Sequence, residues 1–413
     1  MTQGLDRKGL DPDHPLTVQA GPFVQSSAPP GVINLGLGQP SPRLLPIAAL
    51  GQAAAAQLRE GNDPLVLQYG TARGYPQFRD SLAAFLTAEY AHEVSPNELM
   101  VTGGTSSALT FVSETFAQPG ATVITEDPTY FLAHDIFASA GLQVRGIPTD
   151  AAGLDVDALE QLLTQPDTPP PAFVYCIPAF QNPTGVSLSS ARALRLIDLA
   201  ERHDFIIVAD EPYAALRYSP GDEDDYAGSL ARYDQGRGRV LALGSFSKLL
   251  APGLRLGWAH GAPALIERLA AHGALRSGGC LNPVIANIVH HTLDSGFLAS
   301  HVNQLRAVFG ARCQALSEAL HAHLPNAAFL PPRGGYFCWV DLGFDLGFDL
   351  GFDLGQRVDT ATLLERATQL RFIPGSRCAV QRDLSSFVRL SFAFYETHEL
   401  VEGVARLAEL AHR

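Results

Sequence analysis

Short apolar runs alternate with longer helical patterns from about residue 98 onward, and this alternation restricts the fold more than any other feature of the chain. The helical patterns occupy residues 106–116, 130–140, 190–202 and 263–275. Strands are predicted at residues 99–102, 122–126, 172–177, 205–210, 240–245 and 256–260. Together they predict an α/β domain with a doubly wound, mostly parallel sheet, in which ligands bind beyond the carboxyl ends of the strands.

The pattern changes after residue 283, which indicates a second, smaller domain. Helices are predicted at 284–293, 296–324 and 397–411, with strands in the segment GGYFCWVDL and at 387–391. The 413 residues are also too many for one ordinary domain. We therefore expect three parts. Residues 1–46, rich in Pro and Gly, form an arm that contributes to the small domain, 47–295 form the large domain, and 296–413 form an α+β small domain.

Composition excludes several classes of protein. Forty-two acidic residues against 29 basic ones give a net charge of -13, which disfavours binding to nucleic acid or anionic lipid. No apolar run is long enough to cross a bilayer, and the polar N-terminus is unlike a signal peptide. The five cysteines are scattered without metal or redox spacing, so no metal is expected and the thiols read as core residues of a cytoplasmic protein.

Residues 341–355 repeat the four letters DLGF. Recurring Gly weakens both helix and strand, and the aspartates lack the spacing of a known ion-binding loop. We interpret the repeat as an expansion in a surface loop after a strand; calcium binding and partner binding are the alternatives.

Lysine is nearly absent: only Lys8 and Lys248 occur, and the other 27 basic residues are arginines. Arg cannot form an imine, whereas a Lys amine with a lowered pKa can. Lys8 lies in the polar N-terminal tail, so Lys248 is the one internal lysine. It is a candidate for covalent chemistry with a carbonyl. The alternative is that it has no special role and remains by chance in a chain whose other internal lysines were replaced by arginine.

Two motifs beside predicted strands suggest a phosphate site. The sequence VTGGTSSAL places Gly103, Gly104, Thr105 and Ser106 between a strand and a helix, where exposed amides favour an anion, although such a turn is often only a helix cap. The second motif, SFSKLLAPGLRLGW, gathers phosphate-binding hydroxyls and a guanidinium around the lysine. Its members are Ser245, Ser247, Lys248 and Arg255.

A third motif, VADEPY, ends an apolar strand at Asp210. A buried carboxylate needs a partner, and a protonated pyridine nitrogen would provide one while acting as the electron sink that stabilises a carbanion. A helix N-cap is the simpler alternative.

With these motifs in order, the chain resembles the class I and II aminotransferases, which are fold-type-I enzymes dependent on pyridoxal 5′-phosphate (PLP). The resemblance runs from the NLGLGQP arm to the closing helix. It implies a seven-stranded type of large sheet. The motifs that carry it are QYG with Tyr69, GTSSAL, DPTY with Tyr130, NPTG with Asn182, DEPY with Asp210 and Tyr213, SFSK with Lys248, GLRLGW with Arg255, and VRLSFA with Arg389.

The resemblance implies a role for each of these residues. Lys248 would hold the cofactor as a Schiff base and shuttle the substrate proton. Arg389 would clamp the α-carboxylate, helped by Asn182 and the backbone at Gly38, and so orient the Cα–H bond. The remaining contacts would be to the cofactor: Asp210 to the ring nitrogen, Tyr130 to the ring face, Asn182 and Tyr213 to the phenolic oxygen, and Gly104, Thr105, Ser106, Ser245, Ser247 and Arg255 to the phosphate.

In relatives the residue at Tyr69 reaches the phosphate of the neighbouring subunit, which implies a homodimer with shared active sites. Residues 275–283 would lie at the same boundary, where Arg276 could meet an acidic side chain. Two departures stand out: Thr105, Ser106 and Ser107 occur where many relatives have Gln, and the DLGF repeat replaces a short loop.

The expected reaction moves an amino group from an amino acid to a 2-oxo acid such as 2-oxoglutarate. The alternatives are a PLP-dependent β-lyase or other chemistry on an amino acid, because fold and cofactor do not fix which bond breaks, and a noncatalytic PLP-binding regulator. The sequence does not identify the amino donor; similarity to stand-alone 2-aminoadipate and aromatic aminotransferases hints at a bulky or dicarboxylic one.

Overall fold

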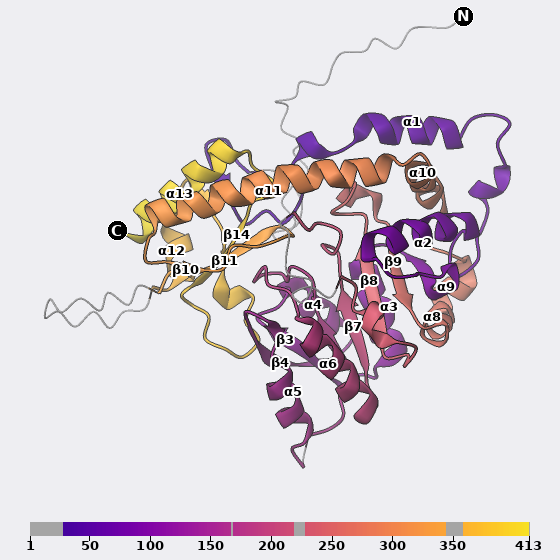
Figure 1. Ribbon diagram of the computed structural model, residues 1–413, viewed down its shortest axis with the longest axis horizontal. Coiled ribbons are helices and arrows are strands. Elements are labelled where there is room, and N and C mark those ends of the chain that lie inside the picture. Colours follow the sequence, from indigo (N-terminus) through magenta and orange to yellow (C-terminus); the bar gives the residue numbers. More distant parts are fainter. Residues whose placement is uncertain (1–27, 167, 219–227, 344–357, 413) are drawn as a thin grey trace, which may run out of the picture.

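The large part of the molecule is built on one eight-stranded sheet (Figure 1). The computed structural model describes residues 28–166, 168–218, 228–343 and 358–412. The strand order is β2–β9–β8–β7–β6–β3–β4–β5. In chain order the bounds are β2 Leu99–Thr102, β3 Thr122–Asp127, β4 Gln143–Asp150, β5 Gly153–Leu154, β6 Phe173–Cys176, β7 Ile206–Asp210, β8 Val240–Ser245 and β9 Gly257–Gly261.

Five adjacent strands, from β8 through β7, β6 and β3 to β4, are parallel, whereas β9 runs antiparallel to both β2 and β8. The predicted mostly parallel α/β sheet is therefore confirmed, with seven strands of four residues or more and the two-residue β5 at one edge. All six strands predicted from the alternation are present within one or two residues.

Helices cover both faces of the sheet because successive residues of a strand point to opposite sides. On one face Val208 packs with residues of α3 (Thr105–Phe116), α4 (Phe131–Ser139) and α8 (Pro263–Ala270). On the other face Ile207 packs with α5 (Val156–Leu163) and α6 (Ser190–Arg202). Continuous apolar strands such as β7 are buried on both sides for this reason.

The small part contains an antiparallel sheet in the order β10–β11–β14–β13 and the parallel pair β1–β12. The 27-residue α11 spans the length of the junction with the large part and packs against α13 (Figure 1). The bounds are β1 Ile33–Asn34, β10 Ala328–Phe329, β11 Phe337–Asp341, β12 Leu370–Arg371, β13 Ile373–Pro374, β14 Phe387–Ser391, α11 Phe297–His323, α12 Thr360–Arg366 and α13 Thr397–Ala411.

The remaining helices connect these layers. The longer ones are α1 Ile47–Gln57, α2 Pro76–Tyr90 and α10 Pro283–Asp294. The shorter ones are η1 Pro42–Leu44, η2 Pro64–Leu67, η3 Pro96–Glu98, α7 Ala231–Asp234, η5 Pro252–Leu254, α9 Gly273–Gly278 and η6 Gly375–Arg377. None of the described helices has the length and apolar character needed to cross a membrane.

Two of the differences from the sequence predictions have a clear local cause. The alternation missed β4, since Gly146 and Pro148 interrupt its apolar pattern, and this strand tolerates them near the sheet edge, where its pairing with β5 involves only Thr149 and Asp150. The single helix predicted at 263–275 is instead α8 and α9, because the His272 side chain accepts a hydrogen bond from the Ala274 amide and caps a second helix.

Most of the DLGF repeat, from residue 344 on, lies outside the described residues; β11 ends at Asp341, the first residue of the repeat. All five cysteines are buried and free, as the sequence predicted.

Candidate active site

Parallel strands bring three of the motifs to one edge of the sheet. The strands β6, β7 and β8 are neighbours and end at Cys176, Asp210 and Ser245. Their carboxyl ends therefore lie side by side, and Lys248 follows three residues after β8. The edge predicted to bind a ligand thus carries both the buried carboxylate and the internal lysine.

The amine of Lys248 lies in a crowded, positively charged environment. Its Nζ donates a hydrogen bond to the carbonyl oxygen of Gly38 at 2.6 Å and lies 5.5 Å from the centre of the Tyr336 ring. The pKa of Lys248 is lowered to about 8: burial is the main cause, the nearby charge of Arg389 acts in the same direction, and the charge of Asp210 opposes the change. Compared with an ordinary lysine, a much larger fraction of this amine is neutral and therefore nucleophilic near neutral pH, as imine formation requires.

Asp210 presents one carboxylate oxygen without a partner. The residue is 3% exposed, and its Oδ2 accepts a hydrogen bond from the Tyr175 hydroxyl at 2.9 Å. Its Oδ1 is buried and has no hydrogen-bond partner within the described part of the chain. Burial raises the pKa of Asp210 to about 7, while Tyr175 and Lys248 oppose that rise. A buried acceptor left open in this way fits a cationic donor such as a pyridinium nitrogen.

The N-terminus of α3 meets Arg255. Gly104 precedes the helix with φ of +86°, and no side chain caps the first turn, where Thr105 and Ser106 lie. A Cβ at Gly104 would lie 3.2 Å from Nη2 of Arg255, which also donates to the carbonyl of Gly103 at 3.2 Å. Open amides, a helix N-terminus and a guanidinium together suit a phosphate dianion.

The two serines of the lysine motif lie close together. The Ser245 side chain is buried, and its Oγ accepts a hydrogen bond from the Ser247 amide at 3.1 Å. This turn leads the chain from β8 into Lys248.

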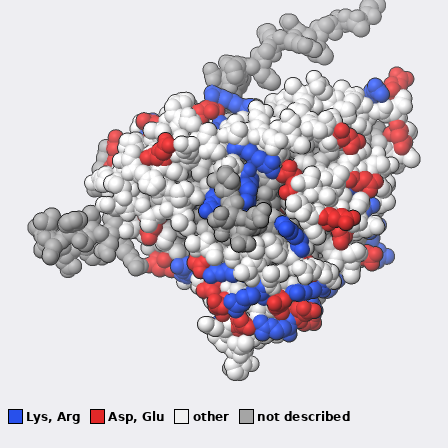
Figure 2. All heavy atoms as spheres, in the orientation of Figure 1, with Lys and Arg blue, Asp and Glu red and all other residues white. Residues whose placement is uncertain are grey.

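Arg389, on β14, reaches from the small part into the junction. Its Nη1 donates to Oδ1 of Asn182 at 2.9 Å and its Nη2 to the carbonyl of Gly36 at 2.8 Å, and the guanidinium lies 4.1 Å from the centre of the Phe337 ring. The residue is 4% exposed, and burial lowers its pKa. In Figure 2 several Lys and Arg side chains gather around the middle of the displayed face.

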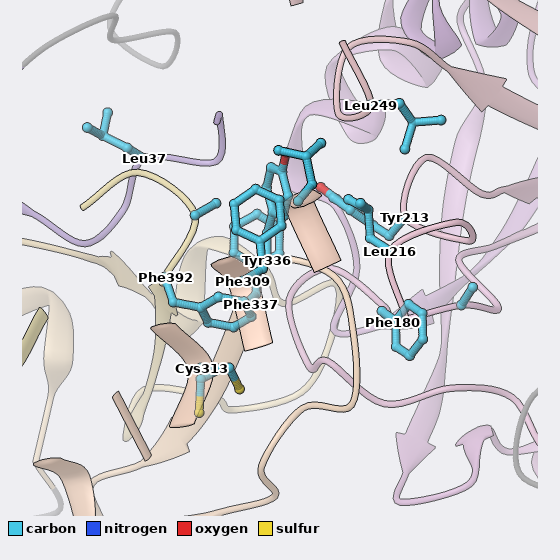
Figure 3. Close-up of a cluster of buried hydrophobic side chains, with 14 of the residues drawn as sticks. Leu37, Phe180, Tyr213, Leu216, Leu249, Phe309, Cys313, Tyr336, Phe337 and Phe392 are labelled. Carbon is cyan, nitrogen blue, oxygen red and sulfur yellow. The ribbon is translucent and has the colours of Figure 1, made fainter. Parts of the chain in front are cut away.

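Aromatic side chains form one wall of the site. Tyr213 lies 5.3 Å from Tyr336 and 5.9 Å from Phe337, ring centre to ring centre, within the apolar cluster drawn in Figure 3. Burial, and secondarily the charge of Asp210, raises the pKa of Tyr130 to about 12. Burial also raises the pKa of Tyr213, so both hydroxyls stay protonated at neutral pH.

Two predicted residues lie outside this group. Tyr69 is 86% exposed, next to η2. Arg276, on α9, lines a cavity of about 500 Å³ together with Arg73, Arg79 and Glu267.

Sequence reasoning missed Tyr175 and Tyr336. Tyr175 was visible as the one polar-tipped side chain in an apolar strand that ends beside Asp210, which is a usable signal. Tyr336 donates its hydroxyl to the carbonyl of Lys248 at 3.1 Å, and nothing in its local sequence indicates that contact across 88 positions.

Comparison with known proteins identifies the protein family to which the chain belongs. The family model of class I and II aminotransferases matches residues 30–407, and the chain belongs to that family. It is a PLP-dependent aminotransferase of fold type I, as the motifs predicted.

Three relatives illustrate the similarity. The chain is 33% identical to aromatic-amino-acid aminotransferase 1 of Thermococcus litoralis, over 92% of this chain and 87% of the relative. It is 31% identical to the 2-aminoadipate transaminase of Thermus thermophilus, over 92% and 89%. The structure of the Pyrococcus horikoshii kynurenine aminotransferase, in complex with PMP, superposes with a TM-score of 0.81 at 32% identity, covering 94% of this chain and 92% of that one.

Proposed function

We propose that the site at the carboxyl edge of the large sheet transfers an amino group between an amino acid and 2-oxoglutarate, with Lys248 as its covalent residue. The observation that carries the proposal is the position of the one internal lysine. Its amine lies close enough to Asp210 and Arg389 for their charges to change its pKa. PLP supplies an aldehyde that bonds to amines and a ring that withdraws electrons from the bond to be broken.

Each remaining contact has a physical reason. Asp210, with its open Oδ1, would bind the protonated ring nitrogen. The α3 N-terminus, from Gly104 through Thr105 and Ser106, would hold the phosphate with Arg255, Ser245 and Ser247. Tyr213 and Asn182 would donate hydrogen bonds to the phenolic oxygen, and the buried Tyr130 would stack on the ring.

Arg389 would bind the substrate α-carboxylate with two parallel hydrogen bonds. Its contacts to Asn182 and to the carbonyl of Gly36 hold the guanidinium in one orientation before the substrate arrives. A Cβ at Gly38 would approach Phe337 to 3.1 Å, so glycine there lets the arm lie close to the site. A fixed carboxylate orients the Cα–H bond, and the neutral amine of Lys248 would take the proton from Cα and return it at C4′.

The relatives bear on the substrate. Those named above are an aromatic-amino-acid, a 2-aminoadipate and a kynurenine aminotransferase. We therefore expect a bulky aromatic or dicarboxylic amino donor, and a screen of amino acids against 2-oxoglutarate would identify it.

A homodimer with shared sites is part of the proposal. Exposed large apolar side chains concentrate between α1 and Tyr69, which is unusual for a solvated surface. They are Ile47, Leu58, Leu65, Leu67 and Tyr69. Burying this segment against a second copy would bring Tyr69 toward the partner's phosphate site. We place the protein in the cytoplasm. We also keep the domain boundaries near 46 and 295: the start of α1 at Ile47 supports the first, and the break between α10 and α11 supports the second.

The decisive test is the site of covalent attachment. Borohydride treatment of the PLP-loaded protein, followed by peptide mass spectrometry, should find the cofactor on the peptide containing Lys248. Lys248→Ala should lose the visible absorbance and the transfer of the amino group to 2-oxoglutarate while it stays folded. Lys8→Ala, which removes the other lysine of the chain, is the matched control and should change neither.

Two results would overturn the proposal. One is label on a residue other than Lys248. The other is pyruvate and ammonia formed from the amino acid without glutamate, which would indicate a lyase instead.

A further inference from the structure

We infer that Tyr175 is a positioning residue of this enzyme: its hydroxyl holds Asp210 as an ionised, oriented carboxylate and so keeps the proton on the cofactor ring nitrogen. The inference rests on the proposed role of Asp210. It adds a residue from a different strand to the site and assigns that residue a function of its own.

Neighbouring strands fix the two groups against each other. Tyr175 lies on β6 opposite Val208 of β7, two residues before Asp210. The hydroxyl meets Oδ2 at 2.9 Å, Tyr175 has no exposed surface, and its ring packs edge-on against Phe137 at 5.4 Å. Two buried strands and a buried ring leave the hydroxyl little freedom to turn elsewhere.

The direction of the hydrogen bond is determined by chemistry. Burial and the charge of Asp210 raise the pKa of Tyr175 well above its usual value, so the phenol stays protonated. Its hydroxyl is therefore the donor of the hydrogen bond, and the carboxylate is the acceptor. A donated hydrogen bond favours the charged form of a carboxylate. With Oδ2 occupied in this way, Oδ1 has no partner among the described residues and can accept a hydrogen bond from a bound molecule.

The other groups around Asp210 do not replace Tyr175. Glu126 and Glu211 are buried carboxyls near Asp210 whose effect is repulsive when they ionise. They are bound by other donors: Glu126 by the Ile177 amide and Gln181, Glu211 by the Leu230 amide. Lys248 attracts Asp210 through its charge, but its amine donates its hydrogen bond to the Gly38 carbonyl and not to that carboxylate. Of the described side chains, Tyr175 alone donates a hydrogen bond to Asp210.

Removing the Tyr175 hydroxyl should therefore shift the shared proton from the ring nitrogen of the cofactor toward Asp210. Without its donor the buried carboxylate becomes more basic and competes better for the proton that it shares with the ring nitrogen. A neutral ring withdraws electrons less well, so loss of the Cα proton slows. Because a hydrogen bond to a charged group is strong, we expect a change of about tenfold or more in the proton equilibrium.

The test uses Tyr175→Phe in the full-length holoenzyme loaded with PLP that carries ¹⁵N in its ring. The inference requires the ¹⁵N resonance to move from the pyridinium range toward that of neutral pyridine. Tyr218→Phe is the matched control, because it also removes a hydroxyl that donates to a protein oxygen, the Gly334 carbonyl at 3.1 Å. That control should leave the resonance unchanged.

Kinetics provide a second readout. Tyr175→Phe should lower kcat at least tenfold with little change in KM, whereas the same substitution should add little in an Asp210→Asn background, since both act through one carboxylate. An unchanged ¹⁵N shift, or an equal loss in both backgrounds, overturns the inference. Borohydride labelling of Lys248 in Tyr175→Phe distinguishes this failure from failure of the proposed function, because the label should persist there.

Discussion

At the scale of single residues, the environment of Lys248 makes its amine less basic than that of an ordinary lysine. The amine donates to a backbone carbonyl at Gly38 instead of a carboxylate at contact distance, so no ion pair holds its proton tightly. Burial and the positive charge of Arg389 then favour the neutral amine, while Asp210 limits the effect. The chain uses Arg for its other internal basic positions, which keeps competing amines out of the folded region.

This environment predicts the pH dependence of cofactor uptake. The pKa of Lys248 falls from 10.5 to about 8, so the amine is protonated below that pH and neutral above it. Covalent uptake of PLP by the apoprotein, followed by absorbance in a stopped-flow instrument, should therefore speed up as pH rises through about 8 and then level off. Asp210→Asn removes the charge that raises this pKa and should move the midpoint lower. A midpoint near 10.5 in the wild-type protein would contradict the prediction.

At the scale of elements, the N-terminus of α3 presents several backbone amides to the proposed phosphate site at once. The first turn of α3 leaves its amides unsatisfied, and Gly104 takes a backbone conformation reserved for glycine while leaving space for Arg255. The pairing of β2 with β9 brings this turn next to Arg255, a contact that supports the proposed phosphate site.

Gly104→Ala should separate phosphate binding from ring binding. The added methyl group strains the backbone and displaces Arg255 from its position 3.2 Å away, so the Kd for PLP should rise at least tenfold. Pyridoxal, which lacks the phosphate, should lose much less affinity. Gly273→Ala, on α9 with open space around the position, is the control and should bind PLP normally. Equal losses for both ligands would mean that the helix N-terminus does not hold the phosphate.

An ion pair connects α11 with the residue that precedes α13. Arg312 of α11 is 1% exposed and donates to the partly exposed Glu396 at 2.6 Å and to the Ala393 carbonyl at 2.7 Å. Arg312→Ala removes a buried side chain and both hydrogen bonds and should lower the free energy of unfolding by about 2 kcal/mol in urea denaturation. Arg195→Ala, whose ion pairs on α6 are exposed, should shift the midpoint little. A loss no larger than that of the control would show that the pair is unimportant for stability.

At the scale of the whole molecule, the site exists only where three segments meet. The arm supplies carbonyls at Gly36 and Gly38, the large part supplies Lys248 and Asp210, and the small part supplies Arg389. The contact between Arg389 and Gly36 spans 353 positions of sequence. Movement of the small part relative to the large one would therefore change the position of Arg389 relative to Lys248 and Asp210.

The shared dimer can be tested by complementation. Tyr69→Ala and Lys248→Ala should each have low activity, but mixing the two after partial unfolding should restore about a quarter of wild-type activity. Half of the dimers are then hybrids, and each hybrid has one site with both native residues. Leu65→Glu with Leu67→Glu should yield monomers in light scattering, whereas Leu194→Glu, exposed on α6, should not. Absence of any recovery together with a dimeric wild type would argue against Tyr69 acting across the interface.

Local patterns in the sequence determined most strands of the large sheet and the candidate lysine. The alternation of apolar runs and helical patterns located β6, β7 and β8. Asp210 and Ser245 each end one of these strands, and the carboxyl ends of neighbouring parallel strands lie at the same edge of a sheet. The scarcity of lysine singled out Lys248 without any structure. The same local reading missed β4, whose Gly and Pro are permitted by its place near the sheet edge.

Tertiary structure alone decided the contacts between distant segments. Strand register and the packing of the two parts decide three of these contacts. Tyr175 donates to Asp210, Tyr336 donates to the carbonyl of Lys248, and the carbonyls of the arm accept from the lysine and the arginine. A sequence pattern specifies which face of an element is apolar, because that follows from the local geometry of the backbone. It does not specify which atom of another element lies 3 Å away, because that depends on the packing of the whole chain at once.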